Sequence, residues 1–354
     1  MSKNGKIFDI NKIGLLLYNL EATRYDVKNY MIEQSQFEKD TRSRSNAEKK
    51  FDRSFITLTK VVAWGIVVLL ILMALTVAWQ AIPSLNEFGF SFLFKSVWNP
   101  VANDGKGDYG AWPMIVGTLV SSVLALFIAV PLGLGTAIFL SEDFIPQKII
   151  IPLTFMVELL AAIPSVVYGL WGIYVLLPFL KPIETFLGKY LGWIPIFSIP
   201  DNVSAGGPGM FPASIILSIM ILPIITAISR DSLTSLPPDL RQASLGLGAS
   251  RWGTIIRVLI PAAFSGIVGS IMLGLGRAMG ETMAVTMLIG NANSIKVTLF
   301  APANTIASLM ANQFSEASGL QLSSLMYTGV ILFALTLIVN ILANWVVNQI
   351  KAKY

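Results

Sequence analysis

Residues 237–261 read PPDLRQASLGLGASRWGTIIRVLIP and join two long apolar stretches of the chain. Two prolines followed by Asp239 are typical of a helix start, because proline is tolerated in the first turn and an acidic residue favours the helix N-terminus. Gly246 and Gly248 then interrupt the helix. The segment therefore predicts a short helix at a membrane surface, attached to membrane-spanning helices at both of its ends.

The composition of the whole chain is that of a membrane protein. Hydrophobic residues make up 54% of the 354 residues and charged residues only 13%, against roughly 25% charged residues in soluble proteins. Six stretches are long and apolar enough to cross a bilayer. We predict an all-α polytopic membrane protein with six transmembrane helices, at about residues 61–79, 112–140, 149–180, 211–228, 258–289 and 325–347.

The distribution of Lys and Arg orients these six spans. The segments on the side of the two termini carry 18 Lys and Arg residues, whereas the three opposite loops carry five. The positive-inside rule then places both termini in the cytoplasm. We expect a cytoplasmic N-terminal segment (1–55), a transmembrane domain (56–350) and, within it, a cytoplasmic loop (229–257).

The residue inventory excludes several kinds of chemistry. The chain has no His and no Cys, so it cannot contain a Ser-His-Asp triad, an HExxH zinc site, a thiolate nucleophile or a disulfide. Its net charge of +5 does not indicate a nucleic-acid partner, because the basic residues flank apolar spans in contact with lipid. We therefore expect no catalytic residue and no metal site.

The fifth predicted span contains two charged residues, Arg277 and Glu281. They are four residues apart, so on one helix they share a face and can pair. Because an Arg at membrane depth costs roughly 2.5–3.5 kcal/mol, such residues usually line the protein interior or a pathway. A guanidinium together with the Thr282 hydroxyl suits an oxyanion, and a carboxylate would favour protonated phosphate over sulfate. A purely structural salt bridge is the alternative.

The third predicted span contains Pro164. Proline leaves a backbone carbonyl without its helical partner, and a broken helix in a membrane is tolerated where it lines a cavity or is buried in protein. The neighbouring Ser165 is then a candidate hydrogen-bond donor. A plain proline kink is the alternative interpretation.

The polar loop resembles the EAA loop of ABC importer permeases, whose pattern is Glu-Ala-Ala, three residues, Gly, nine residues and Ile-x-Leu-Pro. Here Gln242-Ala243-Ser244 stands for the triplet, Gly248 for the glycine, and VLIP at 258–261 for the last element. The spacing matches at each step, with Gln for Glu, Ser for the second Ala, Val for Ile and Ile for Leu. The resemblance implies a type I ABC importer permease in which a cytoplasmic coupling helix sits in a groove of an ATPase. The residues that it assigns to ATPase coupling are Gln242, Ala243, Ser244, Gly248, Arg251 and Pro261.

The ATPase must be a separate polypeptide. The chain contains no GxxxxGK[ST] phosphate-binding loop. We therefore expect ATP and Mg²⁺ on a partner ATPase, no cofactor in this chain, and a transport subunit rather than an enzyme.

Two further motifs resemble the phosphate transporter permeases. They are AIPSVVYGLWG at 162–172 and GRAMGETMA at 276–284, and the YGLWG sequence favours the PstC type over the PstA type. The resemblance implies a permease for inorganic phosphate in the bacterial inner membrane. Its partners would be a second permease of PstA type, an ATPase dimer of PstB type and an extracytoplasmic phosphate-binding protein of PstS type. The residues expected along the substrate path or its gate are Arg277, Glu281, Thr282 and Ser165.

Three alternatives stay open at this point. A secondary transporter or channel also uses intramembrane charges, but it needs no EAA-like loop. An intramembrane enzyme would be limited to carboxylate chemistry, and the Asp residues lie in loops or in the N-terminal segment. A permease for another oxyanion, such as sulfate or molybdate, is the third.

Overall fold

The structure is a computed structural model that describes residues 46–102, 107–142, 144–201 and 203–351. The chain divides into two units, residues 1–71 and 72–354. In the first unit, the described residues form the N-terminal part of helix α2 (Asn46–Phe88). The second unit contains the rest of α2, β1 (Trp98–Asn99), β2 (Asp108–Tyr109), α3 (Trp112–Ser141), α4 (Gln147–Ala162), α5 (Ser165–Trp171), α6 (Leu177–Leu191), α7 (Met210–Thr234), α8 (Pro238–Gly246), α9 (Arg251–Thr254), α10 (Ile260–Ala262), α11 (Phe264–Gly280), α12 (Met283–Leu288), α13 (Ile306–Gln313) and α14 (Gly319–Lys351).

The described residues confirm the prediction of a polytopic helical membrane protein. Five helical stretches are long and apolar enough to span a bilayer, and a bent pair of helices can form a sixth span. The five are Lys49–Leu93, Trp112–Ser141, Ser165–Leu191, Met210–Thr234 and Gly319–Trp345, and the bent pair is Arg251–Ala262 with Phe264–Gly280.

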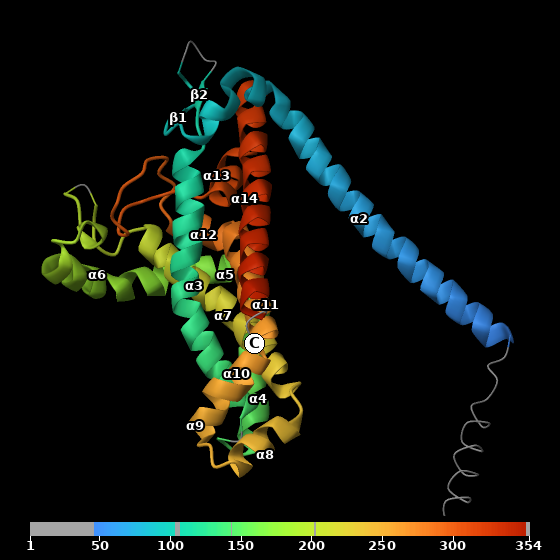
Figure 1. Cartoon of the computed structure of the whole chain (residues 1–354). Coiled ribbons are helices and arrows are strands. Elements are labelled where there is room, and N and C mark those ends of the chain that lie inside the picture. The colour runs from blue at the N-terminus through green and yellow to red at the C-terminus, as the bar shows by residue number, and fades with distance from the viewer. Residues whose placement is uncertain (1–45, 103–106, 143, 202, 352–354) are drawn as a thin grey trace, which may run out of the picture. The chain divides into compact units, whose positions relative to one another are not determined.

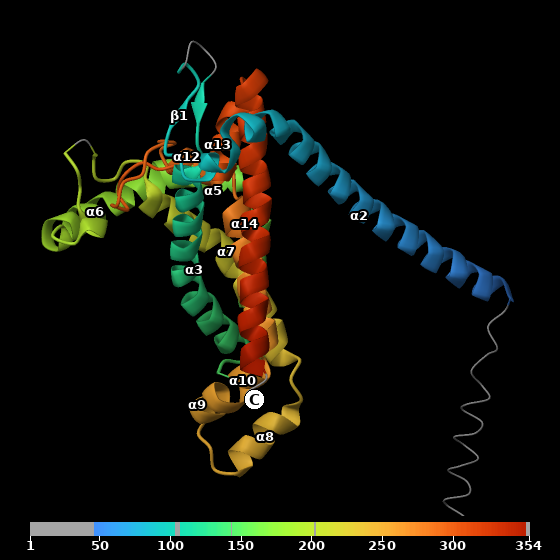
Figure 2. The same ribbon diagram turned by 45° about the horizontal axis from the view of Figure 1, so that its top comes forward.

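In the second unit, α3 and α14 run in roughly the same direction, with α8 and α9 at one end and β1 and β2 at the other (Figure 1). Figure 2 shows the same arrangement after a rotation, and in both views α6 runs across the direction of α3 and α14. The short helix predicted between the fourth and fifth spans is present as α8.

The third predicted span, 149–180, is not one straight helix. Helix α4 ends at Ala162, the next two residues are extended, and α5 begins at Ser165. The break has a simple cause, because proline lacks an N–H and forces the residue before it out of the helical region. After α5 the chain continues through a π-helical turn at Gly172–Leu176 into α6, which extends beyond residue 180.

The fifth predicted span, 258–289, is also interrupted. It bends by 71° between α10 and α11, next to Pro261. It breaks again after Gly280, where Glu281 is extended before α12 begins at Met283. Glycine weakens a helix, and the Glu281 side chain accepts a hydrogen bond from the N–H of Ala284 at 3.4 Å, which satisfies the start of the new helix.

Helices α3 and α7 form the centre of the core through a stripe of small residues. Every fourth residue of α3 from 117 to 137 is Gly, Ser or Ala, and all of them are buried. Such a stripe lets two helix backbones approach closely. The Thr226 hydroxyl of α7 donates to the Gly133 carbonyl oxygen at 3.3 Å, and a methyl group at Gly133 would lie 3.0 Å from Ile225.

An aromatic cluster packs at the end of the second unit that carries β1 and β2. Phe92 stacks on Tyr327 with ring centroids 4.6 Å apart, and Trp98 meets Tyr109 at 5.0 Å. The Trp98 indole donates to the Gln313 amide oxygen at 2.8 Å. Burial in this cluster raises the pKa of the Tyr109 phenol above its ordinary value. The cluster ties β1 and β2 to α13 and α14.

Candidate functional site

Helix α8 presents two of the six residues predicted for ATPase coupling at the surface. It begins at Pro238 with Asp239 in its first turn, as its sequence predicts. Gln242 and Ala243 are exposed. The Ser244 hydroxyl is instead half-buried and lies 2.9 Å from the Thr254 hydroxyl of α9. A hydrogen bond between these hydroxyls therefore joins the two helices.

The link between α8 and α9 depends on Gly248 and Ser250. Gly248 has a φ of +88°, a conformation that is costly for residues with a Cβ atom. The Ser250 hydroxyl accepts a hydrogen bond from the N–H of Gly253 at 3.1 Å and so caps α9. Leu247, which begins the link, is 90% exposed. The link therefore holds an apolar side chain away from the rest of the protein.

An ion pair that the sequence analysis did not identify connects α8 to the end of α3. Arg241 Nε donates a hydrogen bond to Glu142 Oε1 at 3.0 Å, and Arg241 Nη2 lies 3.0 Å from the same oxygen in an ion pair. The same guanidinium donates to the Leu233 carbonyl oxygen of α7 at 3.0 Å. Both charged side chains are mostly buried. One residue of α8 is thus bonded to the ends of two membrane helices.

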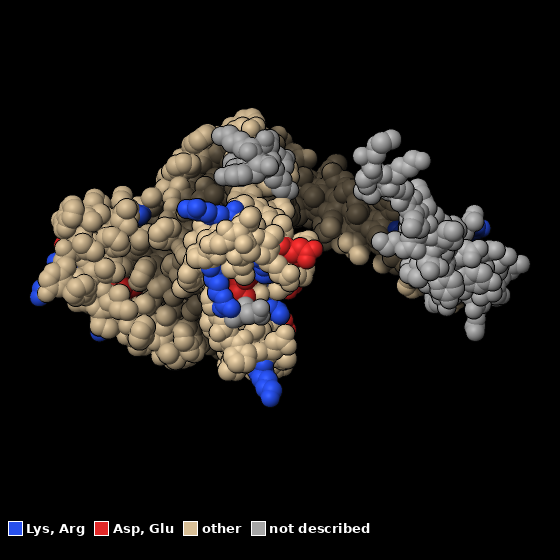
Figure 3. All heavy atoms as spheres, turned by 60° about the horizontal axis from the view of Figure 1, so that its bottom comes forward, with Lys and Arg blue, Asp and Glu red and all other residues tan. Residues whose placement is uncertain are grey.

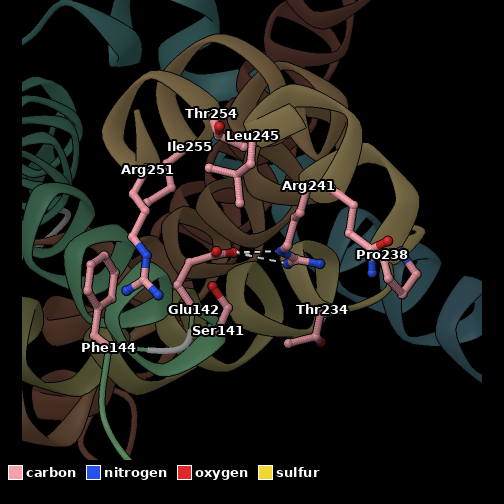
Figure 4. A pocket seen from close by; sticks show the side chains of 11 residues that line it. Ser141, Glu142, Phe144, Thr234, Pro238, Arg241, Leu245, Arg251, Thr254 and Ile255 are labelled. Carbon is pink, nitrogen blue, oxygen red and sulfur yellow. Dashed lines mark hydrogen bonds and ion pairs between the residues drawn. The ribbon is translucent and has the colours of Figure 1, made fainter. Parts of the chain in front are cut away.

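A cavity of about 400 Å³ lies beneath α8. Figure 4 shows the Glu142 and Arg241 side chains directed toward each other inside it, while Arg251 extends along the wall toward Phe144. The Phe144 ring also lies against Trp252 of α9, with centroids 5.8 Å apart. Residues that line the cavity are Ser141, Glu142, Phe144, Thr234, Pro238, Arg241, Gln242, Leu245, Arg251, Thr254 and Ile255.

Pro261 lies in α10, beside the 71° bend that leads into α11. The turn before it, Ile255–Leu259, is π-helical. A proline removes one helical hydrogen bond and pushes on the preceding turn, which accounts for both irregularities. The bend places α9 and α10 at an angle to the membrane helix that follows.

Basic side chains gather at the end of the second unit that carries α8 and α9. Figure 3 shows several Lys and Arg side chains on this face. Sequence places Arg230, Arg241, Arg251 and Arg257 in and around the two helices. Clustered basic residues beside spanning helices are the pattern on which the positive-inside rule rests.

The structure brings the Arg277 and Glu281 side chains together, although not on one helix as predicted. Arg277 lies in the last turn of α11, and Glu281 follows the end of that helix. Arg277 Nη2 and Glu281 Oε2 are 3.9 Å apart, and the side chains are 42% and 6% exposed, respectively. A buried carboxylate is therefore held next to a guanidinium that keeps most of its donors free of Glu281.

The two helix breaks lie close to each other in space. The Tyr168 hydroxyl of α5 donates to the Leu160 carbonyl oxygen across the first break at 2.8 Å, and it lies within electrostatic range of Arg277. Gly169 of α5 packs against Met287 and Ala284 of α12, so closely that a side chain there would clash. The broken third span thus packs on the broken end of the fifth span.

Ser165 and Thr282 are less directly connected to the charged pair. Both are half-buried. The Thr282 carbonyl oxygen accepts a hydrogen bond from the Thr286 hydroxyl at 2.7 Å. Among the described residues, no hydrogen bond joins the Ser165 or Thr282 side chain to Arg277 or Glu281. Their predicted role in binding is therefore supported by position alone.

Comparison with known proteins gives the family. Residues 129–352 match the model of the family described as "Binding-protein-dependent transport system inner membrane component". The chain belongs to this family. It is accordingly a transport permease of the inner membrane and not an enzyme.

Two curated relatives of this permease show how far the similarity extends. It is 46% identical to the phosphate transport system permease protein PstC of Pasteurella multocida (strain Pm70), over 76% of its own length and 83% of the relative. It is 43% identical to the PstC protein of Mesorhizobium japonicum, over 85% and 91% of the two chains. The matched part includes most of the described helices.

Solved structures support the fold of the permease. A crystal structure of a bacterial ABC transporter for import of the acidic polysaccharide alginate matches with a TM-score of 0.55 and 16% identity, over 86% of this chain and 99% of that one. The alginate transporter in complex with a pentasaccharide-bound periplasmic protein matches with a TM-score of 0.56, also at 16% identity. At this identity the likeness shows the fold alone, that of an ABC importer permease.

Proposed function

We propose that this chain is the PstC-type permease subunit of an ATP-driven importer of inorganic phosphate. The observation that carries the proposal is 43–46% identity to PstC permeases over most of the chain. Its partners are then a PstA-type permease, a PstB-type ATPase dimer that holds ATP and Mg²⁺, and a PstS-type phosphate-binding protein outside the cell. Both termini, α8 and α9 face the cytoplasm.

The path for phosphate passes the two adjacent helix breaks. Arg277 offers a guanidinium that is nearly half exposed and only weakly engaged by Glu281 at 3.9 Å. A guanidinium donates two parallel hydrogen bonds to an oxyanion. Ser165 and Thr282, at the starts of the helices after the two breaks, supply hydroxyl donors. These four residues form the proposed path or gate.

Glu281 gives the path a preference for phosphate. At neutral pH phosphate retains a proton and can donate it in a hydrogen bond to a carboxylate, whereas sulfate carries no such proton. A fixed carboxylate near the path therefore repels sulfate without a compensating bond. Glu281 suits this role because it is buried and its position is fixed by the Ala284 N–H.

ATPase coupling runs through the contacts of α8. The exposed residues Gln242, Ala243 and Leu247 contact the ATPase, and Gly248 shapes the link to α9. Movement of α8 then reaches α3 through Glu142, α7 through Leu233 and α9 through Thr254. Arg251 and Pro261 belong to the segment that passes the movement on to α11.

The test is ATP-dependent uptake of labelled phosphate and sulfate into vesicles that contain the complete complex. Native complex should take up phosphate in preference to sulfate. Arg277→Gln should lose phosphate uptake while assembly and basal ATPase activity persist. Arg53→Gln, an exposed arginine of α2 outside the proposed path and outside the coupling segment, should retain uptake. Uptake of sulfate but not phosphate by the native complex would contradict the proposal that phosphate is the transported anion. Full phosphate uptake by Arg277→Gln would return the pair to a structural role.

A further inference from the structure

Helix α6 is the second half of the apolar stretch Ser165–Leu191, but it is placed unlike α3 and α14. It continues α5 through the π-helical turn Gly172–Leu176, yet it runs across the direction of α3 and α14 (Figures 1 and 2). It precedes the N-terminal end of α7, whereas α8 follows the C-terminal end of α7. Helix α6 therefore belongs to the side of the bilayer opposite α8.

One face of α6 is buried by the connection to α7. Leu177, Leu180 and Glu184, at positions i, i+3 and i+7, are buried. The Glu184 carboxylate accepts a hydrogen bond from the N–H of Gly206 at 2.6 Å, and Ile199 packs against Gly188. Ile199 and Gly206 of the connection thus cover this face within the protein itself.

A second face of α6 is apolar, aromatic and exposed. Phe179, Ile183, Phe186 and Tyr190 follow the spacing i, i+4, i+7 and i+11 and are 38–66% exposed. The Phe186 and Tyr190 rings are 4.6 Å apart. Trp193, just after the helix, is also exposed. This aromatic stripe is too long and too continuous to be a scatter of single surface residues.

The remaining face of α6 is exposed and polar. Lys181, Thr185 and Lys189 recur every four residues, so they form a row beside the aromatic stripe. The Lys189 ammonium lies 5.6 Å from the centre of the Tyr190 ring, at the border between the two rows. Besides its buried face, α6 therefore has two exposed faces, one aromatic and one polar, so its exposed surface is amphipathic.

We propose that α6 is an interfacial helix that lies in the phospholipid layer on the side opposite α8. Its aromatic stripe enters the boundary between headgroups and acyl chains, and its lysine row faces the headgroup phosphates. Helices that lie in this boundary combine Phe, Trp or Leu on one face with Lys or Arg on the other, and aromatic residues are enriched at this depth. Helix α6 also runs across the direction of α3 and α14, as a helix that lies in the plane of the bilayer does.

The test uses single cysteines, since the native chain has none. Phe186→Cys of the aromatic stripe and Thr185→Cys of the lysine row are neighbours, are both exposed, and differ only in the row that they report. Each variant is labelled with bimane in the complete complex, built with cysteine-free partner subunits. The complex is reconstituted in vesicles of phosphatidylethanolamine and phosphatidylglycerol, and emission is quenched by nitroxide lipids or by iodide.

The proposal expects opposite responses at the two positions. The label at residue 186 should be quenched by nitroxide lipids about threefold more than the label at residue 185, and iodide should give the reverse order. Equal quenching of both labels by iodide would show a surface in water and overturn the proposal. Protection of the residue 186 label from both quenchers would assign the stripe to another subunit and overturn it as well. Tyr190→Cys against Lys189→Cys repeats the comparison one turn later, in case either variant fails to assemble.

Discussion

Glu281 has two separate partners, one for each of its carboxylate oxygens. One oxygen faces the Arg277 guanidinium at 3.9 Å, and the other accepts the Ala284 N–H at 3.4 Å. The residue therefore combines a structural task, the start of α12, with an electrostatic one. A substitution that separates the two tasks must keep the shape and the acceptor while removing the charge.

Glu281→Gln makes this separation. The amide oxygen can still accept from the Ala284 N–H, but the charge that we propose repels sulfate is gone and an N–H donor is added. We expect the ratio of phosphate to sulfate uptake to fall roughly tenfold, because hydrogen bonds to charged groups contribute about 1.5–3 kcal/mol. Uptake of both labelled anions into vesicles measures the ratio. Glu158→Gln, an exposed acid of α4, should leave it unchanged, and an unchanged ratio in Glu281→Gln would contradict a role in selectivity.

Single residues also show where sequence reasoning was sufficient and where it was not. Arg277 and Glu281 stood out because charges are rare in apolar spans, and they do pair. Glu142 did not stand out, since it directly follows a span, where charges are common. Its importance depends on Arg241, 99 residues away along the chain, and sequence spacing carries no signal for such a contact.

Among the elements, α8 is notable for its fixed attachment to the spans. The Glu142–Arg241 pair is mostly buried and combines a hydrogen bond from Nε with a 3.0 Å ion-pair contact from Nη2. Removing one partner of such a pair leaves a buried charge uncompensated. If α8 drives α3 through this pair, then loss of either partner should uncouple ATP hydrolysis from transport.

The test is a charge exchange across the pair. Glu142→Arg and Arg241→Glu should each lower phosphate uptake about tenfold or more, with assembly and basal ATPase activity retained. The double variant should recover part of the uptake, though not all, because Arg241 also bonds the Leu233 carbonyl oxygen. Uptake and ATPase activity measured on the same vesicles give the coupling ratio. Double-variant losses that are simply additive would show that the two residues act independently.

The sequence predicted the spans and the start of α8 better than the course of the chain after a helix break. Apolar length revealed the spans, and the prolines with Asp239 revealed the start of α8, because both signals are local. The direction of a helix after a break is not local. Hydropathy merged α4, α5 and part of α6 into one span at 149–180, whereas packing of Gly169 on α12 and burial of Leu180 turn the chain away.

At the scale of the whole molecule, the side on which each loop lies can be measured directly. The proposed orientation places α8 and α9 in the cytoplasm and β1 and β2 outside. Leu247, between α8 and α9, is 90% exposed, and Val101, after β1, is 82% exposed. They are matched in residue type and accessibility, and they lie at opposite ends of the second unit.

Cysteines introduced at these two positions should respond differently to a membrane-impermeant maleimide. In spheroplasts that lack the ATPase subunit, Val101→Cys should be labelled when they are intact, and Leu247→Cys should be labelled only after permeabilisation, because loops rich in Lys and Arg stay inside. Labelling is measured as the increase in mass of the purified chain. Labelling of Leu247→Cys in intact spheroplasts would reverse the orientation and, with it, the placement of the ATPase.

The 71° bend between α10 and α11 has a mechanical consequence. The bend acts as a fulcrum: α9 and α10 form the short arm next to the proposed ATPase contact, and α11, with 17 residues, forms a long arm of about 25 Å. A rotation of about 10° about this fulcrum swings the far end of the long arm by roughly 4 Å. That end carries Arg277, and the swing is comparable to the width of an inorganic oxyanion. A small movement at the proposed ATPase contact is thus geometrically sufficient to bring the guanidinium into the proposed path or to withdraw it.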